Sequence, residues 1–262
     1  LFYKPSVPPI AEYRLDEGAW VTGSAGQVAD SSASVRHGTA LGLAQTLAGG
    51  KVCRGGGMPG NTSAAEVDAI RTGLRFSDAS VNLLGQGTIA FWYKSASVWS
   101  GGPAAQLLDA TLVNGTWFSL TRTAGGTLYF AATDSTGVVR SVETGAQVFA
   151  ADTWVHVAVT WNFNALPAAN QDALRIYINA GTPGSSLFTS SGTLAPTLDY
   201  LYLGDNPSGF TAPKGTVNGV AGVVDELRIY NAELNAAQLV VARDATHPCP
   251  ALFIDHFDIQ HA

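Results

Sequence analysis

Short runs in which apolar and polar residues alternate recur along the whole chain, separated by Gly, Ser, Asn and Pro. Alternation is the period of a β-strand, whose successive side chains point to opposite faces of a sheet. At least ten such runs follow one another with no dividing linker, which predicts one all-β domain, an antiparallel sandwich of two sheets. The clearest runs are AEYRLDE (11–17), GTIAFWYKS (87–95), DTWVHVAVTWN (152–162), ALRIYINA (173–180), LDYLYLGD (198–205) and GVVDELRIY (222–230).

Two regions depart from this pattern. A stretch rich in Gly, Ser and Ala continues from the first run to about residue 65, and we expect it to be loop. Residues 231–243, NAELNAAQLVVAR, form the one good helix candidate, with Asn231 as the N-cap. The sequence changes character after it, so we predict one domain over 11–246, followed over 247–262 by a linker and the start of another domain.

One carboxylate interrupts the alternation of the run at 222–230. Asp225 has the same parity as Val223, Leu227 and Ile229, so the pattern directs its side chain to the apolar face. An unpaired buried carboxylate is very costly. The sequence therefore predicts a compensating partner for Asp225, or a place at the rim of the sheet.

Composition supports a large core and narrows the range of partners. Apolar residues make up 46% of the chain, and six Trp, eight Tyr and eleven Phe can fill a sandwich interior. The net charge of −6 argues against a nucleic-acid partner, which requires a basic surface. No apolar run is long enough to span a membrane. The opening LFYKPSVPPIAEYRL does not have the pattern of a signal peptide, so we expect any export signal to lie outside these residues.

The two cysteines, Cys53 and Cys249, are far apart in the sequence. Metal-binding or redox cysteines usually occur as close pairs, so we expect a single disulfide. Closing a loop of this length stabilises the folded state by about 5 kcal/mol in the chain-entropy model. The alternative is a pair of unrelated free thiols. A disulfide would imply an oxidising compartment.

Four segments, TIAFWYK, DTWVHVAVTWN, LRIYINA and VVDELRIYNAELNAAQL, occur in this order along the chain. Together they resemble the laminin-G-like jelly roll of the concanavalin A-like lectin and glucanase group, over about residues 11–245. The resemblance implies a concanavalin A-like jelly roll with one short C-terminal helix. The tail CPALFIDHFDIQHA and the region of Cys53 are similar to the MshQ proteins of mannose-sensitive haemagglutinin (MSHA) type IV pilus biogenesis, large exported proteins with further domains.

In sandwiches of this group the first and last strands usually lie side by side, which would bring Asp16 and Asp30 close to Asp225. Clustered carboxylates repel one another unless a cation lies among them, and Ca²⁺ takes about 6–8 oxygen ligands. The resemblance thus implies a structural Ca²⁺ site formed by Asp225, Asp30 and Asp16. The alternative is that Asp225 accepts backbone N–H groups or pairs with an arginine such as Arg14.

Glycosidases of this superfold carry acid residues two positions apart on one strand face, one as nucleophile and one as acid/base. The segment AEVDAIR offers Glu66 and Asp68, but no third carboxylate follows them. Asp225 and Glu226 are adjacent, so they would point to opposite faces. His156, in a strand with Trp154, is expected to be a packed structural histidine. We therefore predict that the chain is not an enzyme.

Exposed loop aromatics are the usual platforms for sugars. Trp99 in SVWSGGP and Phe210 in NPSGFTAPK are the candidates here, and for each the alternative is a place in the core. The resemblance implies a non-catalytic recognition or adhesion module of a secreted or surface-exposed bacterial protein, directed at a carbohydrate, a pilus component or another surface protein. The alternatives are a purely architectural domain and an enzyme whose site is unrecognised.

Overall fold

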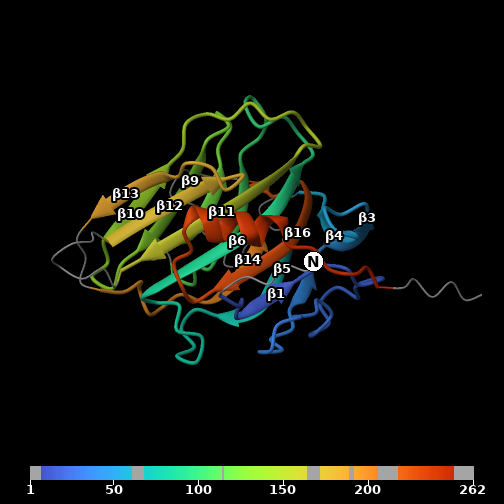
Figure 1. The fold of residues 1–262 in the computed structure, drawn as a ribbon, viewed down its shortest axis with the longest axis horizontal. Helices are drawn as coiled ribbons and strands as arrows, with labels where there is room; N and C mark the ends of the chain where they lie inside the picture. The colour runs from blue at the N-terminus through green and yellow to red at the C-terminus, as the bar shows by residue number, and fades with distance from the viewer. Residues whose placement is uncertain are drawn as a thin grey trace, which may run out of the picture.

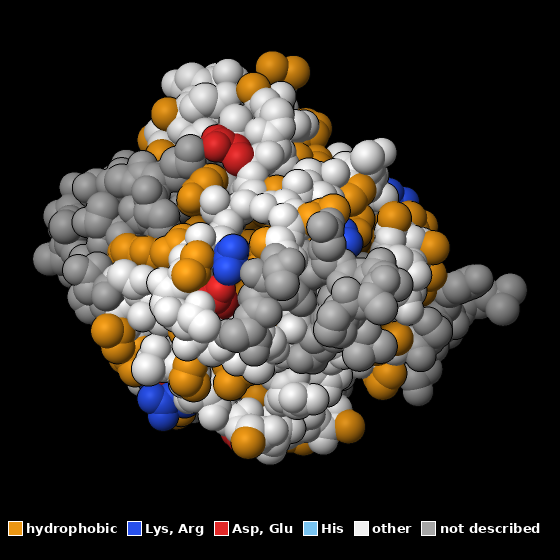
Figure 2. All heavy atoms as spheres, turned by 90° about the vertical axis from the view of Figure 1, so that its left-hand side faces the viewer, with side chains coloured by type: hydrophobic (Ala, Val, Ile, Leu, Met, Phe, Trp, Pro, Cys, Tyr) orange, Lys and Arg blue, Asp and Glu red, His pale blue; other side chains and the backbone are white. Residues whose placement is uncertain are grey.

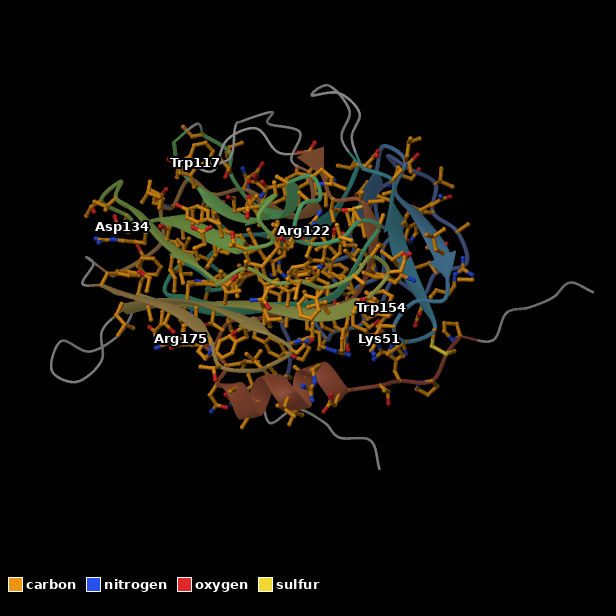
Figure 3. All side chains as sticks on the ribbon, turned by 90° about the horizontal axis from the view of Figure 1, so that it is seen from above. Lys51, Trp117, Arg122, Asp134, Trp154 and Arg175 are labelled. Carbon is orange, nitrogen blue, oxygen red and sulfur yellow. A yellow bond between two sulfur atoms is a disulfide. The ribbon has the colours of Figure 1, made fainter. Side chains whose placement is uncertain are left out.

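A computed structural model describes residues 7–60, 68–113, 115–163, 172–188, 192–205 and 218–250. Two β-sheets pack face to face, and the C-terminal helix lies on the outer face of one of them, as the view from above in Figure 3 shows; Figure 1 looks onto that helix. The prediction of an all-β, two-sheet sandwich with one short C-terminal helix is confirmed.

The sheet beneath the helix, called the helix-covered sheet, has eight strands within the described residues. Every pairing in it is antiparallel. In spatial order it contains β13 (Gly184–Phe188), β12 (Asp172–Ile178), β11 (Trp154–Asn162), β6 (Gln86–Ser95), β16 (Gly222–Tyr230), β4 (Arg54–Met58) and β3 (Gln45–Ala48), and β1 (Ala11–Tyr13) also pairs with β16. The first and last strands are therefore neighbours, as predicted.

The opposite sheet, called the second sheet, also has eight strands in the part of the chain that the structure describes. It contains β10 (Val139–Glu143), β9 (Leu128–Thr133), β8 (Phe118–Arg122), β7 (Ala105–Asp109), β14 (Tyr200–Gly204), β5 (Ala69–Arg75) and β2 (Thr39–Leu41), and the short β15 (Asn218–Gly219) pairs parallel with β7. The chain crosses repeatedly between the two sheets, so their inner faces form one continuous core.

The core confirms the parity predicted for β11. Val157, Val159 and Trp161 are fully buried between the sheets, whereas Ala158 packs on the other side with residues of the helix. Trp161 also contacts an aromatic cluster in which the ring centroids of Phe76 and Phe118 lie 4.5 Å apart. Large rings on alternate positions fill the space between two sheets, and the strand period places them there.

The helix α1 (Ala236–Asp244) begins later than predicted. Asn235, not Asn231, is the N-cap, and its side chain accepts a hydrogen bond from the Gln238 backbone N–H at 3.0 Å. The preceding residues are held out of helical geometry by Thr88, whose hydroxyl donates to the Ala232 carbonyl at 2.7 Å and accepts the Leu234 N–H at 2.9 Å. A contact across 146 residues, invisible to a local pattern, therefore delays the helix.

The predicted loop before residue 65 is wrong over residues 39–58, where the chain forms β2, β3 and β4. Glycine has low strand propensity, and β4 reads Arg-Gly-Gly-Gly-Met. These glycines are required by close packing. A Cβ on Gly56 would lie 2.8 Å from the Ile70 side chain, and one on Gly57 would lie 2.3 Å from the Leu47 side chain.

A β-bulge in β16 changes the position predicted for Asp225. Asp225 pairs with Trp92 and Arg228 pairs with Ala90, so two residues of β16 lie opposite one residue of β6. Within the bulge Glu226 adopts a left-handed φ of 54°. An extra residue reverses the parity of everything after it. The prediction that Asp225 shares a face with Leu227 is therefore wrong: Asp225 lies beside Trp92 on the outer face.

The surface carries little charge. The side of the molecule drawn in Figure 2 shows mostly uncharged polar and apolar atoms with isolated charged groups, consistent with 13% charged residues overall. In the part of the chain that the structure describes, no helix combines the length and the apolar character needed to cross a membrane.

Candidate functional site

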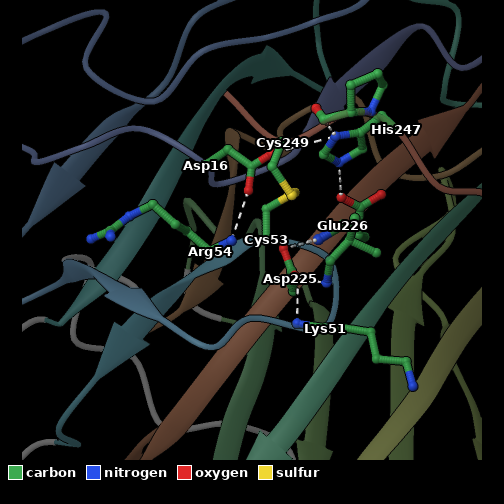
Figure 4. Close-up of a disulfide and its surroundings, with 10 residues drawn as sticks. Asp16, Lys51, Cys53, Arg54, Asp225, Glu226, His247 and Cys249 are labelled. Carbon is green, nitrogen blue, oxygen red and sulfur yellow. Dashed lines mark hydrogen bonds and ion pairs between the residues drawn. A yellow bond between two sulfur atoms is a disulfide. The ribbon is translucent and has the colours of Figure 1, made fainter. Parts of the chain in front are cut away.

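Chemically active side chains converge where the chain returns from α1 to the rim of the helix-covered sheet. The residues after the helix, 245–250, are called the C-terminal strap. Cys249 of the strap forms a disulfide with Cys53, the residue before β4, with a Cα–Cα distance of 5.4 Å (Figure 4). This separation lies within the usual range for disulfides. The predicted Cys53–Cys249 disulfide is confirmed, and it tethers the strap to the sandwich.

Asp225 is completely buried beneath the strand-connecting residues that precede Cys53. Its Oδ2 accepts the backbone N–H groups of Lys51 at 2.6 Å and Val52 at 2.9 Å, and its Oδ1 accepts the N–H of Glu226 at 2.9 Å. Burial raises the pKa of Asp225 to about 8, while the N–H of Val52 opposes the shift and the neighbouring Glu226 adds to it. Backbone donors, the predicted alternative to a cation, thus compensate this carboxyl group.

The bulge turns Glu226 toward the strap and into a buried ionic network. Its carboxylate forms an ion pair with Arg228, and its Oε1 lies 2.6 Å from Nε2 of His247. Arg228 also donates to Glu12 at 3.1 Å and to the Ala242 carbonyl of α1 at 2.8 Å. Burial raises the pKa of Glu226, and the charges of Arg228 and His247 oppose that shift. The network joins β1, β16, α1 and the strap.

Asp16 contacts His247 at the ring nitrogen that does not face Glu226. Its Oδ1 accepts the backbone N–H of Arg54 at 2.9 Å, and its Oδ2 lies 3.5 Å from Nδ1 of His247. That Oδ2 is buried and accepts no hydrogen bond from any residue that the structure describes. Ligand atoms of Asp16, Cys53 and His247 all lie within 4.8 Å of one another. We call Asp16, Cys53, His247 and Cys249 the strap cluster.

The three carboxylates predicted to hold Ca²⁺ do not fit such a site. Asp30 lies elsewhere on the rim, where it accepts the N–H groups of Glu12, Ser32 and Arg36 and the hydroxyl of Ser32. Both oxygens of Asp225 are likewise already acceptors. Over the described residues, Asp225, Asp30 and Asp16 form no shared cluster. Oxygens engaged by N–H donors are poor ligands for a cation, so this geometry gives the ion no set of free oxygens.

We therefore expect chelation to leave the stability of the domain unchanged. The melting temperature in EDTA should agree with that in millimolar Ca²⁺, because an ion stabilises only the state that binds it, by RT ln(1 + [L]/Kd). Thermal unfolding of wild-type protein and of Asp225→Asn, each with EDTA and with Ca²⁺, tests this. A rise in melting temperature with Ca²⁺ that Asp225→Asn abolishes would restore the calcium hypothesis.

The raised pKa of Asp225 predicts a loss of stability at mildly alkaline pH. The folded state keeps a proton that the unfolded state releases, from the ordinary value of 3.8 up to about 8. The free energy of unfolding should therefore fall as pH rises through that window, by up to about 1.4 kcal/mol per pH unit. His156, whose pKa burial lowers to about 3, acts with the opposite sign only below about pH 6.5.

Urea unfolding of the wild type and of Asp225→Asn between pH 6.5 and 8 isolates this effect from His156. We expect a clear negative slope in the wild type and a shallower slope in Asp225→Asn, since an amide has no proton to lose. Equal slopes would show that the three N–H donors keep Asp225 ionised. His156→Leu serves as a control that leaves the slope above pH 6.5 intact.

The remaining predicted residues have different outcomes. Trp99 is fully buried, with its ring 5.1 Å from that of Phe149 and 6.1 Å from that of Tyr93. The prediction of Trp99 as a sugar platform is therefore wrong, and the core alternative is the one observed. Phe210 lies outside the described residues, as does Glu66. Asp68 is buried and accepts the N–H of Leu43 at 2.7 Å.

Sequence reasoning missed His247, Arg228 and Glu12. His247 lies in the predicted linker, and only its place two residues before Cys249 could have marked it. Arg228 follows Glu226 by two residues, so the strand period puts both side chains on one face, but nothing in the local sequence indicates that both are buried. His156 was predicted to be structural, and it is buried with its ring 5.3 Å from that of Trp92.

Comparison with known proteins finds a matching family and solved structures of similar fold. The family model described as concanavalin A-like lectin/glucanases superfamily matches residues 68–240. Solved structures with the same fold include the botulinum neurotoxin serotype C1 binding domain, with a TM-score of 0.61, 12% identity and coverage of 89% of this chain and 51% of that one. No curated protein sequence matches the chain.

Two further solved structures are similar in the same way. The botulinum neurotoxin serotype D ligand-binding domain, in complex with N-acetylneuraminic acid, has a TM-score of 0.59 and 11% identity, covering 90% of this chain and 51% of that one. The binding domain of Paraclostridial Mosquitocidal Protein 1 has a TM-score of 0.58 and 13% identity, covering 89% and 51%. The chain thus spans about half the length of the binding domains that it matches, and at these identities the likeness concerns the fold.

Proposed function

The chain belongs to the concanavalin A-like lectin/glucanases superfamily, and we propose that it is a non-catalytic module that recognises a carbohydrate. The observation that carries the proposal is the family match over 68–240 together with a complete two-sheet sandwich. The similar solved structures are named as binding domains, and one of them was solved with a sialic acid. A fold alone does not fix a function, so the proposal also needs a surface.

An aromatic ring flanked by two arginines on the outer face of the second sheet offers such a surface. Tyr200 pairs with Arg75 and lies one bulge away from the Tyr202–Arg71 pair. The guanidinium carbons of Arg71 and Arg75 lie 5.1 and 5.6 Å from the centre of the Tyr200 ring. We call Tyr200, Arg71 and Arg75 the tyrosine–arginine surface.

This surface has the chemistry to bind an acidic sugar. An aromatic face packs against the C–H groups of a sugar ring, and a guanidinium binds a carboxylate through two parallel hydrogen bonds. Arg75 is half-exposed and shares its charge with Asp199, which accepts from its Nε at 2.9 Å. The carboxylate of Asp199 adds an acceptor for sugar hydroxyls. A glycan carrying an acid group fits these residues best.

The two adjacent carboxylates of β16 are poorly placed for glycosidase chemistry. A glycosidase needs two carboxyl groups facing a substrate about 5–9.5 Å apart. Asp225 and Glu226, the two that adjoin each other in β16, are buried and engaged by backbone N–H groups, Arg228 and His247. Substrate would have to displace the strap to reach them. This supports a binding role.

The disulfide supports a place for this module in an oxidising compartment. We propose that it belongs to a secreted or surface-exposed bacterial protein, where a carbohydrate or a surface protein is the natural partner. The link to MSHA-type pilus biogenesis rests on the resemblance of the tail and the Cys53 region to MshQ proteins. An architectural domain without a soluble ligand is the alternative.

A glycan array with fluorescently labelled protein separates the two. We expect binding to acidic glycans, lost in Arg71→Gln and in Tyr200→Ala. Arg175→Gln is the matched control, since Arg175 pairs with Glu233 on the other sheet and should leave binding unchanged. Absence of binding to every glycan by folded wild-type protein would favour the architectural alternative. Release of sugars from polysaccharides by the same protein would show that it is an enzyme.

A further inference from the structure

The strap cluster has the composition and spacing of a zinc site, once its disulfide is absent. We propose that the chain with both cysteines as thiols binds one Zn²⁺ ion through Cys53, Cys249, His247 and Asp16. The ion would hold the C-terminal strap in the place where the disulfide holds it after oxidation. This inference is independent of carbohydrate recognition, which uses the opposite sheet.

The donor set favours zinc over a hard cation. Zn²⁺ binds thiolate sulfur, imidazole nitrogen and carboxylate oxygen, with four ligands in a tetrahedron, whereas Ca²⁺ takes oxygens. Two sulfurs, one nitrogen and one oxygen meet in the strap cluster. They come from three separate segments of the chain, Asp16 after β1, Cys53 before β4, and the strap (Figure 4). A four-ligand ion would therefore cross-link the two segments that the disulfide joins and, in addition, the segment of Asp16.

The distances already approach those of a tetrahedral ion. Bonds of about 2.0–2.1 Å from zinc to nitrogen and oxygen put those two ligand atoms about 3.4 Å apart. His247 Nδ1 and Asp16 Oδ2 lie 3.5 Å apart. Two thiolates on zinc, each about 2.3 Å from the ion, are about 3.8 Å apart. Once the S–S bond is absent, Cys53 and Cys249 need only move apart to that spacing.

His247 is oriented as a metal-binding histidine is. Such a histidine donates its other ring N–H to a carboxylate or carbonyl, which fixes the tautomer. Nε2 of His247 lies 2.6 Å from Oε1 of Glu226, a carboxylate that is itself held by Arg228. In the oxidised structure Nδ1 lies 3.1 Å from the Pro248 carbonyl oxygen and 3.5 Å from Oδ2 of Asp16. With the proton on Nε2, Nδ1 has a lone pair for the ion, and Zn²⁺ would replace its contact with the Pro248 carbonyl. Glu226 is thus the positioning residue of the proposed site.

Asp16 supplies an independent observation. Its Oδ2 is buried in a residue only 8% exposed, and it accepts no hydrogen bond within the described parts of the chain. A buried carboxylate oxygen without a donor costs free energy. This oxygen faces His247 and lies within 4.8 Å of the Cys53 sulfur. A Zn²⁺ ion would satisfy it.

The zinc-bound form and the disulfide form exclude each other, because both use the sulfur atoms of Cys53 and Cys249. A newly made chain carries two thiols, which lose two protons to solvent as Zn²⁺ binds their thiolates. Oxidation by a protein disulfide removes two electrons from the two thiolates, forms the Cys53–Cys249 bond and releases the ion, and the reduced oxidant takes up two protons from solvent to become a dithiol. In the reverse direction a phosphine and water supply two electrons and two protons, and the phosphine leaves as its oxide.

The test is zinc binding by this chain in both redox states. Protein reduced with a phosphine should take up one Zn²⁺ per chain from a chromophoric chelator, and oxidised protein should take up none. Co²⁺ in place of zinc should give the absorption of a tetrahedral thiolate complex. Tryptophan fluorescence and near-UV circular dichroism report whether the reduced chain is folded. A reduced chain that unfolds without metal and refolds with Zn²⁺ would also support the proposal, because binding is then coupled to folding.

Matched variants identify the ligands. Asp16→Asn and His247→Asn should each weaken binding, and Glu226→Gln should weaken it about 10–100-fold through the orientation of His247. His37→Asn, a substitution of an exposed histidine outside the strap cluster, should leave binding unchanged. The proposal fails if reduced protein binds no more Zn²⁺ than oxidised protein, if it stays unfolded with the ion, or if Asp16→Asn and His247→Asn bind like the wild type.

Discussion

Replacing both Cys53 and Cys249 with alanine should lower the free energy of unfolding by about 5 kcal/mol. The disulfide spans 196 residues of sequence, so it removes a large part of the conformational freedom of the unfolded chain. At about 2–4 °C per kcal/mol for a domain of this size, the melting temperature should fall by about 10–20 °C. Guanidinium unfolding of the oxidised wild type and the double variant measures the difference.

The single variants Cys53→Ala and Cys249→Ala are the controls, since each removes the disulfide but only one of the two side chains. Each should lose about as much stability as the double variant. Hydrogen exchange separates two explanations of a smaller effect. If only the backbone amides of the strap lose protection, the disulfide holds the strap and little else. A double variant within about 1 kcal/mol of the wild type would show that the strap detaches before the sandwich unfolds.

The predictable part of the fold is the part governed by local periodicity. The alternation in β11 and β12 reflects burial on two faces, and the structure has Val157, Val159 and Ile176 in the core as expected. The regions that were mispredicted are those where a distant contact overrides the local preference. Position 56 of β4 is glycine because Ile70 leaves no room for a side chain, and Thr88 delays the start of α1.

The site was only partly predictable for a related reason. Isolated cysteines in a chain without close Cys pairs indicated the disulfide, and the odd parity of Asp225 indicated a special position. Neither pattern could show the bulge at Glu226, which depends on a left-handed backbone at a residue that is not glycine. Because of the bulge, Asp225 lies on the outer face beside Trp92 and Leu227 lies in the core, although the two residues have the same parity in the sequence.

The Ca²⁺ hypothesis shows the limit of reasoning from charge alone. The first and last strands are neighbours, as expected, with Tyr13 opposite Leu227. The sequence did not reveal that backbone N–H groups at residues 51, 52 and 54 would meet these carboxylates. Main-chain donors are present at every non-proline residue, so their use depends on loop geometry that no side-chain pattern encodes.

The buried ionic network should make Arg228 one of the most sensitive positions in the domain. The Arg228 side chain is 5% exposed and neutralises Glu226, whose side chain is fully buried, as well as Glu12. Removing one partner of a buried ion pair leaves an uncompensated charge and typically costs about 3–5 kcal/mol. We expect that loss in Arg228→Met, a substitution that keeps the length and apolar stem of the side chain.

The pH dependence and a double variant show that the loss is electrostatic. Without Arg228 the pKa of Glu226, already raised by burial, should rise further, and Glu226 should keep its proton in the folded state. A raised pKa stabilises the folded state at low pH and loses that contribution as pH rises, so Arg228→Met should lose more stability at pH 8 than at pH 5. Adding Glu226→Gln should recover part of the loss at pH 8.

Arg14→Met is the matched control. Arg14 is more exposed and pairs with Glu12 at 3.3 Å, so its replacement should cost at most about 1 kcal/mol of stability. Equal losses in the two arginine variants, or a loss that does not change with pH, would mean that Arg228 acts through packing of its stem against α1.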